Sequence, residues 1–208
     1  MVRQTVHRAQ RLWRCTGAEP EGGAAIGGAT IKIINSTITK ADGGSKSAAI
    51  GAQFWQSTDI EIVNSTINEA NGGNASAGIG GGRYSSDISA TNKQSVKIRI
   101  ANSTVTANGG QAGAGIGSGY DTHCQANDTN AVNDIQITNS TITAQGGKYA
   151  AGIGTGFHAA ALTGSIDAAS TINATFGESF YKDTYTKAQN IGYGVVDPAR
   201  EFAGATVT

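Results

Sequence analysis

The sequence predicts an all-β fold, a right-handed parallel β-helix of about five coils, and three observations carry this prediction. A motif of the form Ile-x-Ile-x-Asn-Ser-Thr recurs along the chain, a Gly-Gly turn follows it, and an Ile-Gly pair ends each unit. Copies of the motif begin at Ile31, Ile60, Ile98 and Ile135, and a shorter copy occupies residues 169–172. Such self-similarity is typical of a repeat architecture in which each unit forms one coil.

The first element, residues 1–21, is predicted to be an N-terminal cap. Its apolar residues lie on one face of a helix, because they are spaced like the successive turns of an α-helix: Val2, Val6, Ala9, Leu12 and Trp13. An amphipathic helix here would cover the bare strand edge at the end of the solenoid. The alternative is a helix that lies on a membrane surface.

The repeats are expected over residues 22–196, with a C-terminal tail over 197–208. Within a unit, Ile31 and Ile33 flank the polar Lys32, and Ile38 lies between two threonines. This alternation is typical of a half-buried strand, so each unit should contain three short strands: Ile-x-Ile, Thr-Ile-x and Ile-Gly. A helix-containing repeat is disfavoured because no segment between these strands keeps a helical period.

Equivalent residues of successive coils become neighbours in such a fold. The outward positions then form two columns of alternating charge, which avoids repulsion between like charges: Lys32, Glu61, Arg99 and Gln136, and beside them Asp59, Lys97 and Asp134. The inward positions form a stack of β-branched side chains: Ile38, Ile67, Val105, Ile142 and Ile172.

Four asparagines recur at a predicted corner, at Asn35, Asn64, Asn102 and Asn139. We expect their side-chain amides to form a ladder that satisfies backbone groups. The same residues spell Asn-Ser-Thr, an N-glycosylation acceptor pattern, but the corner role applies whether or not a glycan is present. The Ile-Gly-x-Gly runs are predicted to be tight corners, because no Gly-Lys-Ser/Thr follows them as in a phosphate loop.

The composition excludes some classes of partner. With 15 basic and 15 acidic residues, the chain has no overall field that favours nucleic acid or an anionic membrane. No segment is long and apolar enough to span a bilayer, and the N-terminus lacks the apolar stretch of a secretory signal. Cys15 and Cys124 belong to no metal-ligand or CxxC spacing, so the redox compartment stays open, as does the oligomeric state.

The run NGGQAGAGIGSG at 108–119, with its copies GGNASAGIGGG and GGKYAAGIGTG, resembles the repeats of large bacterial surface and secreted β-helix proteins. More loosely, it is similar to the pectate-lyase-like β-helix of many polysaccharide lyases and glycoside hydrolases. The resemblance implies the fold and a secreted or cell-surface location. It implies no activity, because such folds host adhesins and enzymes alike, and no catalytic motif matches.

A candidate site follows from the loop lengths. The connection from the Ile-Gly pair to the next unit grows from 10 residues after Ile50 to 19 after Ile79 and after Ile116. Long loops in a compact solenoid often carry function. Two columns of residues follow the Ile-Gly pairs at this corner: Phe54, Arg83, Tyr120 and Phe157, and beside them Trp55, Tyr84, Asp121 and His158.

These residue types favour a site for a polar ligand. Asp121 and His158 are the candidate acid and base, while Asp87 and Asp128 are candidate Ca²⁺ ligands. The candidate substrate-binding residues are Trp55, Arg83, Tyr84, Tyr120 and Phe157, because aromatic faces suit sugar rings and Arg83 suits an anion or a hydroxyl. The alternative is that these aromatic side chains only pack on the edge of the core.

Three functions therefore compete. The first is a hydrolase that acts on a carbohydrate-like or ester substrate, with Ca²⁺ as a candidate cofactor. The second is a non-catalytic bacterial adhesin that binds glycans. The third is ice binding, because the Thr-x-Thr strands resemble the flat face of β-helical antifreeze proteins, although Asn68 and Asn173 interrupt the file of threonines.

Overall fold

The structure is a computed structural model that describes residues 22–54, 56–83, 95–120, 133–157, 162–177 and 188–194, together with the backbone of three outer strands. These outer strands are β1 (Arg3–His7), β2 (Trp13–Thr16) and β19 (Thr206–Val207). All regular elements of the described residues are strands, and they form three parallel sheets. None of these residues belongs to a helix of the length and apolarity that crossing a membrane requires.

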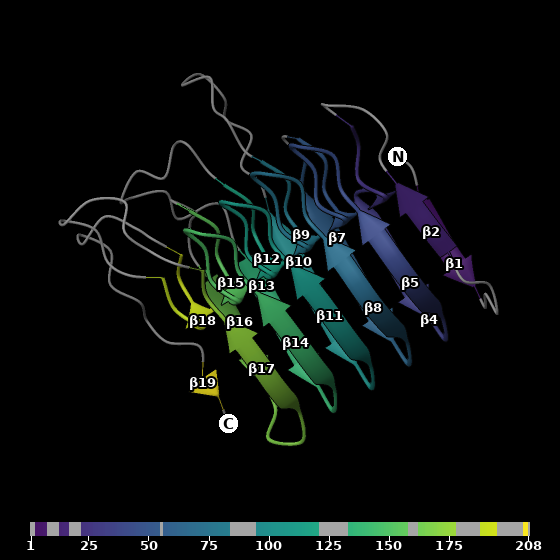
Figure 1. Cartoon of the computed structure of the whole chain (residues 1–208). Helices are drawn as coiled ribbons and strands as arrows, with labels where there is room; N and C mark the ends of the chain where they lie inside the picture. The colour runs from purple at the N-terminus through teal and green to yellow at the C-terminus, as the bar shows by residue number, and fades with distance from the viewer. Residues whose placement is uncertain are drawn as a thin grey trace.

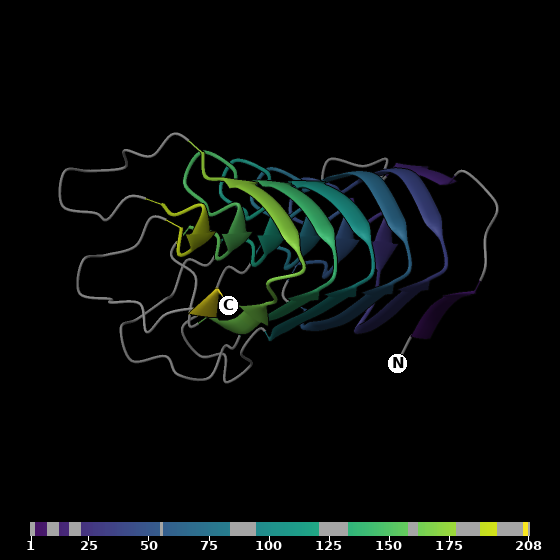
Figure 2. The ribbon, with the colours of Figure 1, turned by 90° about the horizontal axis from the view of Figure 1, so that it is seen from below.

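The three sheets run along the length of a solenoid, and each coil of the chain contributes one strand to each sheet (Figures 1 and 2). The first sheet contains β1, β4 (Thr30–Ile34), β7 (Thr58–Val63), β10 (Val96–Ala101), β13 (Asn133–Thr138), β16 (Leu162–Ile166) and β19. The second contains β2, β5 (Thr37–Asp42), β8 (Thr66–Asn71), β11 (Thr104–Asn108), β14 (Thr141–Gln145) and β17 (Thr171–Thr175). The third contains β3 (Ile26–Gly27), β6 (Ile50–Gly51), β9 (Ile79–Gly80), β12 (Ile116–Gly117), β15 (Ile153–Gly154) and β18 (Ile191–Gly192).

The strand registers confirm the predicted columns. In the first sheet Arg99 lies opposite both Glu61 and Gln136, and Lys97 lies opposite both Asp59 and Asp134. Ion pairs form across these columns, with Lys32 Nζ 2.7 Å from a Glu61 carboxylate oxygen and Arg99 Nη1 2.9 Å from an Asp59 carboxylate oxygen. The alternation of charge read from the sequence therefore corresponds to real contacts between coils.

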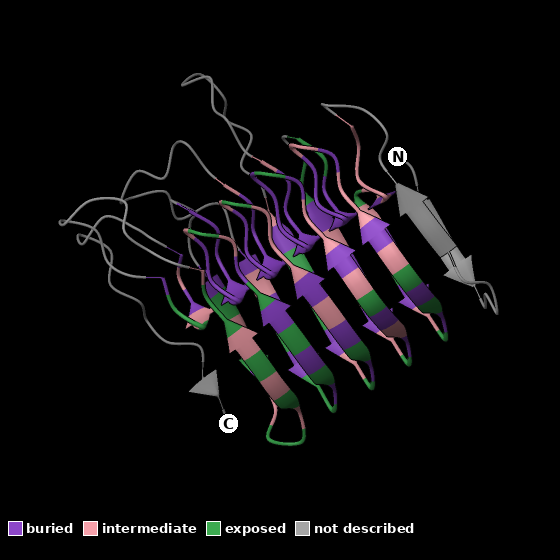
Figure 3. Cartoon of the chain, in the orientation of Figure 1, coloured by how far each residue is buried: buried purple, intermediate pink, exposed green. Residues whose placement is uncertain are grey.

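The core is a stack of isoleucines from all three sheets. Along the first-sheet strands β4, β7, β10 and β13, buried residues alternate with exposed or half-buried ones, and Figure 3 shows such alternation as stripes. In the middle coils the stack is closed to solvent, with Ile60, Ile98 and Ile116 each 0% exposed. Full burial of such a side chain contributes about 1.5–3 kcal/mol, so the repeated isoleucines account for much of the stability of the solenoid.

The corner between the first and second sheets differs in detail from its prediction. The four asparagines have left-handed backbone angles, with φ between 43° and 50°, which Asn tolerates better than most residues. The serine that follows each asparagine supplies the backbone hydrogen bonds instead. Ser103 Oγ accepts the N–H of Ser65 at 3.1 Å and donates to the carbonyl of Ala101 at 2.7 Å.

The serine ladder continues through the stack, and its hydroxyls are buried. Ser36, Ser65, Ser103 and Ser140 each donate a backbone N–H to the serine hydroxyl of the next coil. The asparagines themselves are exposed, and Asn139 Nδ2 donates to Asn102 Oδ1 at 2.7 Å. The predicted asparagine ladder was therefore wrong in its role: the serines satisfy the backbone, and among the four asparagines only Asn139 and Asn102 bond to each other.

The predicted N-terminal capping helix is wrong for residues 3–7 and 13–16, which form β1 and β2. β1 pairs with β4 and β2 pairs with β5, so the chain adds a further rung to two sheets. The physical reason is that the outer edges of β4 and β5 present unpaired N–H and C=O groups, which a strand satisfies and a helix does not. At the other end β19 pairs with β16, within the region predicted as a tail.

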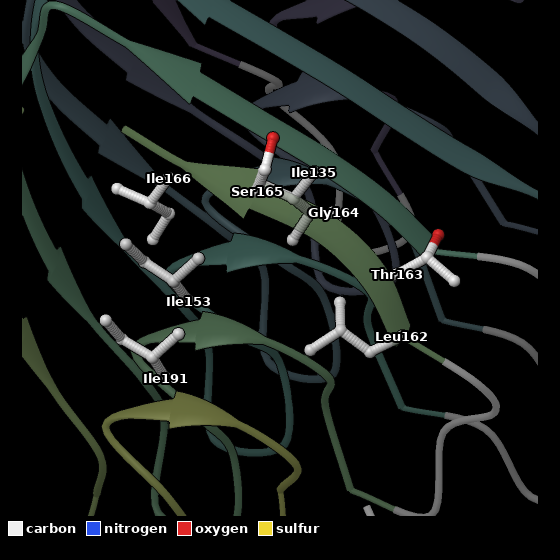
Figure 4. Close-up of a pocket in the computed structure, with 8 residues that line it drawn as sticks. All are labelled: Ile135, Ile153, Leu162, Thr163, Gly164, Ser165, Ile166 and Ile191. Atoms are coloured by element: carbon white, nitrogen blue, oxygen red, sulfur yellow. The ribbon is translucent and has the colours of Figure 1, made fainter. Parts of the chain in front are cut away.

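The last described coil is less regular than the others. Gly164 lies opposite Ile135 in register, where the earlier coils carry isoleucine, and an added Cβ would lie 1.9 Å from the Ile135 carbonyl oxygen. An apolar cavity of about 10 Å³ lies in this coil, lined by Gly164, Leu162 and Ile191 among others (Figure 4). This volume holds at most about one water molecule, so the cavity is a packing gap and not a ligand pocket.

Candidate functional site

The predicted loop corner exists as a column on the structure. We use the name loop corner for Phe54, Arg83, Tyr120 and Phe157, which follow strands β6, β9, β12 and β15. Backbone hydrogen bonds join three of them to the preceding coil: Arg83 N–H donates to the Lys46 carbonyl, Tyr120 N–H to Ala75 and Phe157 N–H to Ala112, at 3.0, 2.8 and 2.9 Å. The same geometry repeats in each coil, so the side chains are held in line.

Three side chains of the loop corner stack along the axis of the solenoid. The Arg83 guanidinium carbon lies 5.6 Å from the centre of the Tyr120 ring. Tyr120 in turn stacks on Phe157, with 5.4 Å between ring centres and 16° between ring planes. Phe157 also contacts Tyr149, whose ring centre is 5.3 Å away. We call Arg83, Tyr120, Phe157 and Tyr149 the loop-corner stack.

The aromatic side chains of this region differ in how far they are exposed to solvent, which indicates different roles. Phe157 is only 5% exposed, so its role at a site would be to support Tyr120 and Tyr149, which are partly exposed. Phe54 is 37% exposed, and the Lys46 ammonium lies 5.2 Å from the centre of its ring. The aromatic residues in the described part of the corner that are exposed or partly exposed are therefore Phe54, Tyr120 and Tyr149.

The loop corner also carries positive charge. The Lys148 ammonium lies 5.3 Å from the Tyr149 ring centre, as Arg83 lies on Tyr120. Within the part of the chain that the structure describes, neither Arg83 nor Lys148 has a carboxylate partner. Arg83 Nε is buried and makes no hydrogen bond there. Each cation is held by an aromatic face and keeps hydrogen-bond donors for a ligand.

Several predicted site residues lie outside the described residues: Trp55, Tyr84, Asp87, Asp121, Asp128 and His158. Arg83, Tyr120 and Phe157 are brought together as the column predicted. Sequence reasoning missed Tyr149, Lys148 and Lys46, which belong to the Gly-Gly turns. Their signal was present in the sequence, because each turn residue stands at a fixed offset from its glycine pair and so forms its own column.

The second sheet presents a different surface, a file of threonines. Thr37, Thr66, Thr104, Thr141 and Thr171 lie opposite one another in register across five strands. Their side chains are exposed or half-buried, and their hydroxyls make no hydrogen bond within the described ranges. Neighbouring strands are about 4.8 Å apart, so the hydroxyls form a regular row.

The file beside it is less regular. Thr106 and Thr143 are in register, but Asn173 follows them. β5 and β8 are each six residues long where β11 has five, and the register shifts between Val105 and Ala107. The additional residue of the two longer strands is charged. There Lys40 lies 3.5 Å from Asp42 and 3.6 Å from Glu69. The uncharged part of this face therefore lies on β11, β14 and β17.

Across the described ranges, no three His, Cys, Asp or Glu side chains gather as metal ligands would. The proposed Ca²⁺ ligands Asp87 and Asp128 lie outside those ranges. The one titratable side chain there with a clearly shifted pKa is Asp167, at the corner after β16. The Ser170 hydroxyl, which donates to this carboxylate, is the main cause that holds the pKa of Asp167 below its usual value of 3.8.

The comparison with known families gives one match. Residues 60–83, 98–120 and 135–157 match the family model described as Beta helix repeat. Each matched stretch runs from a first-sheet strand to the loop corner, so it covers all three strands of one coil. No curated protein and no solved structure matches the chain. The matched repeats and the three parallel sheets identify the chain as a right-handed parallel β-helix repeat protein.

Proposed function

We propose that the chain is a glycan-binding module that holds its ligand at the loop corner. The observation that carries this proposal is the loop-corner stack, in which Arg83 lies on Tyr120 and Tyr120 lies on Phe157. The stack is fixed from below by the buried Phe157 and follows the axis of the solenoid. An extended saccharide chain running along that axis would meet one such position per coil.

The chemistry of the corner suits a polar ligand with apolar ring faces. The partly exposed Phe54 ring offers a face for the C–H groups of a sugar. The guanidinium of Arg83 and the ammonium of Lys148 offer hydrogen-bond donors to hydroxyl or charged oxygens. A rigid scaffold that carries such groups at the base of loops is a common design for recognition sites.

The test compares Tyr120→Leu with the wild type on a glycan array and by affinity electrophoresis in soluble polysaccharides. Leucine keeps apolar volume on Phe157 but removes the ring beneath Arg83, so we expect affinity to fall by about tenfold, which corresponds to about 1.4 kcal/mol. Thr104→Leu, which introduces the same residue on the second sheet, is the control. Equal glycan affinity in both variants would place the binding surface elsewhere.

Hydrolysis of the bound ligand is compatible with this proposal. It would require Asp121 and His158 as acid and base, with Ca²⁺ held by Asp87 and Asp128 as a candidate cofactor. Asp121→Ala and His158→Ala should abolish turnover of a chromogenic glycoside and ester panel without changing the circular dichroism spectrum. Turnover that survives both changes would exclude this pair, and an inactive wild type that binds glycans would support the adhesin role.

Ice binding is a second candidate, because one specific observation favours it. The five in-register threonines of the second sheet keep their hydroxyls free of hydrogen bonds among the described residues. Rows of hydroxyl and methyl groups at strand spacing form a regular surface that can order water. The asparagine at position 173 and the charged bulge on β5 and β8 limit the regular area to the later coils.

Thermal hysteresis measures this candidate directly. Thr141→Tyr places a bulky ring in the middle of the uncharged area and should abolish hysteresis. Gln136→Tyr, an exposed change on the first sheet, should leave it intact. Absence of hysteresis in the wild type would eliminate the ice-binding role.

A further inference from the structure

We propose that the ligand of the loop corner is an acidic polysaccharide, whose carboxylate or sulfate groups are bound by Arg83 and Lys148. This inference rests on the proposed glycan-binding function and specifies the class of glycan. It follows from how the cations of the solenoid are distributed and paired.

Arg83 is an unusual arginine for a folded surface. It is half-buried, its Nε is buried without a hydrogen-bond partner among the described residues, and its guanidinium carbon lies 5.6 Å from the centre of the Tyr120 ring. A buried donor without a partner costs free energy, and an ionised partner would recover more of that cost than a neutral one. A planar guanidinium held in place by a ring is also suited to bidentate contact with a carboxylate or sulfate.

Among the described residues, three cations outside the loop corner form ion pairs with carboxylates. Lys32 pairs with Glu61, Arg99 pairs with Asp59, and Lys40 lies between Asp42 and Glu69. Lys97 lies opposite Asp59 and Asp134 in register. The acidic residues of the described ranges lie on strands of the first and second sheets or, for Asp167, at the corner between them.

Among the described residues, the loop corner has no such compensation. The two turn columns beside it, one of which backbone hydrogen bonds join to it, contain no acidic residue: Ser45, Asn74, Gln111 and Lys148 in one, and Lys46, Ala75, Ala112 and Tyr149 in the next. The acidic residues of the adjoining loops, Asp87, Asp121 and Asp128, lie outside the described residues. Two aromatic-bound cations, Arg83 and Lys148, thus face solvent on an edge of the molecule that has no carboxylate among its described residues. The described part of this edge is therefore positively charged, although the chain as a whole has a net charge of zero.

The spacing of the cations favours a polymer over a small anion. Arg83 lies next to Tyr120 of the following coil, whereas Lys148 belongs to the turn of the coil after that. Coils repeat about every 4.8 Å, so the backbones of Arg83 and Lys148 are offset by about 10 Å along the axis. A chain with repeated charges that runs along the corner matches this offset better than a single small anion does.

The experiment uses two polymers that share one backbone, dextran and carboxymethyl-dextran, and compares the wild type with Arg83→Gln and Lys148→Gln. Arg99→Gln, which removes an equal charge from the first sheet, is the matched control. We expect the wild type to bind the charged polymer more tightly than dextran, with an affinity that falls as salt is raised. Arg83→Gln and Lys148→Gln should each weaken this binding by about threefold to tenfold, whereas Arg99→Gln should not.

The outcomes separate this inference from the function on which it rests. Binding that does not distinguish the two polymers, or that Arg99→Gln weakens as much as Arg83→Gln does, would overturn the acidic ligand. If Tyr120→Leu still weakened binding to a neutral glycan in that case, the glycan-binding function would stand alone. If none of the loop-corner variants changed binding to any glycan, both proposals would fail. Circular dichroism and melting temperature of each variant show that the comparison is between folded proteins.

Discussion

Single corner residues determine which group accepts the hydrogen bonds between coils, and Asp167 is the clearest example. In the earlier coils the N–H of the corner asparagine donates to a backbone carbonyl of the next coil, as Asn102 does to Thr138. At Asn139 the partner is the Asp167 carboxylate, whose two oxygens accept that N–H at 3.1 and 3.0 Å. The Asp167 side chain therefore replaces a backbone carbonyl as the acceptor of the asparagine N–H in the coil where the repeat becomes less regular.

This replacement predicts a pH dependence. The pKa of Asp167 is lowered in the folded state, chiefly by the Ser170 hydroxyl and also by backbone N–H donors, so the folded protein favours the ionised carboxylate. The resulting stabilisation is present above the unfolded pKa, near 3.8, and is lost as pH falls through the lower folded value. We expect Asp167→Asn to lower the urea midpoint at pH 7, and the difference from the wild type to shrink below about pH 4.

Asp134→Asn is the charge control for this measurement, because it removes one carboxylate from the first sheet. A constant difference between the wild type and Asp167→Asn from pH 7 down to pH 2 would contradict the proposed role of the ionised side chain. The titration is followed by circular dichroism in urea at each pH.

At the scale of elements, the periodic features were predictable and the corner chemistry was not. Alternation in Ile31-Lys32-Ile33 reveals a strand and its inward face, because side chains of a strand point to opposite sides. The recurrence of Arg83, Tyr120 and Phe157 at one offset revealed their column. Both inferences use only spacing, which the sequence displays directly.

The errors arose where a residue type allows more than one partner. Asn and Ser at a corner both form local hydrogen bonds, and the sequence does not display that Asn64 takes φ = 49° while Ser65 points inward. The N-terminal segment has the apolar spacing of a helix, but the edge of β4 offers a full row of backbone partners and the segment becomes β1. Tertiary context overrode the local pattern there.

The serine ladder predicts a stability difference between adjacent residues. Ser103→Ala removes a 5% exposed hydroxyl and leaves the Ser65 N–H without its acceptor, which should cost about 1–3 kcal/mol of unfolding free energy. Thr104→Ala, one residue later, removes an exposed hydroxyl that has no such bond, and should change stability by about 0.5 kcal/mol or less. Urea denaturation of the pair measures both, and equal losses would show that the ladder contributes nothing.

At the scale of the whole molecule, each coil contacts only its neighbours, so coils should be separable units. The register defines where a cut preserves the pattern. Lys97 lies opposite Asp134 and Ile98 lies opposite Ile135, so deletion of residues 98–134 joins two equivalent positions. In the shortened chain Ile135 would pair with Ile60, Thr141 with Thr66, and Gly154 with Gly80, and each inward column would stay continuous.

We therefore expect the 98–134 deletion to fold into a shorter solenoid. Its circular dichroism per residue should match the wild type, and its unfolding free energy should fall because one coil's burial and pairing are gone. The deletion also removes Tyr120 and brings Arg83 next to Phe157. The folded fraction of the shortened protein should therefore bind glycan more weakly than the wild type does. Deletion of residues 98–114 is the contrasting variant, because it removes most of β10 and all of β11 but keeps β12, and so leaves a third-sheet strand without the rest of its coil. If both shortened proteins were unfolded, the coils would not be separable units. If both folded equally well, the match of equivalent positions at the cut would not determine whether the solenoid folds.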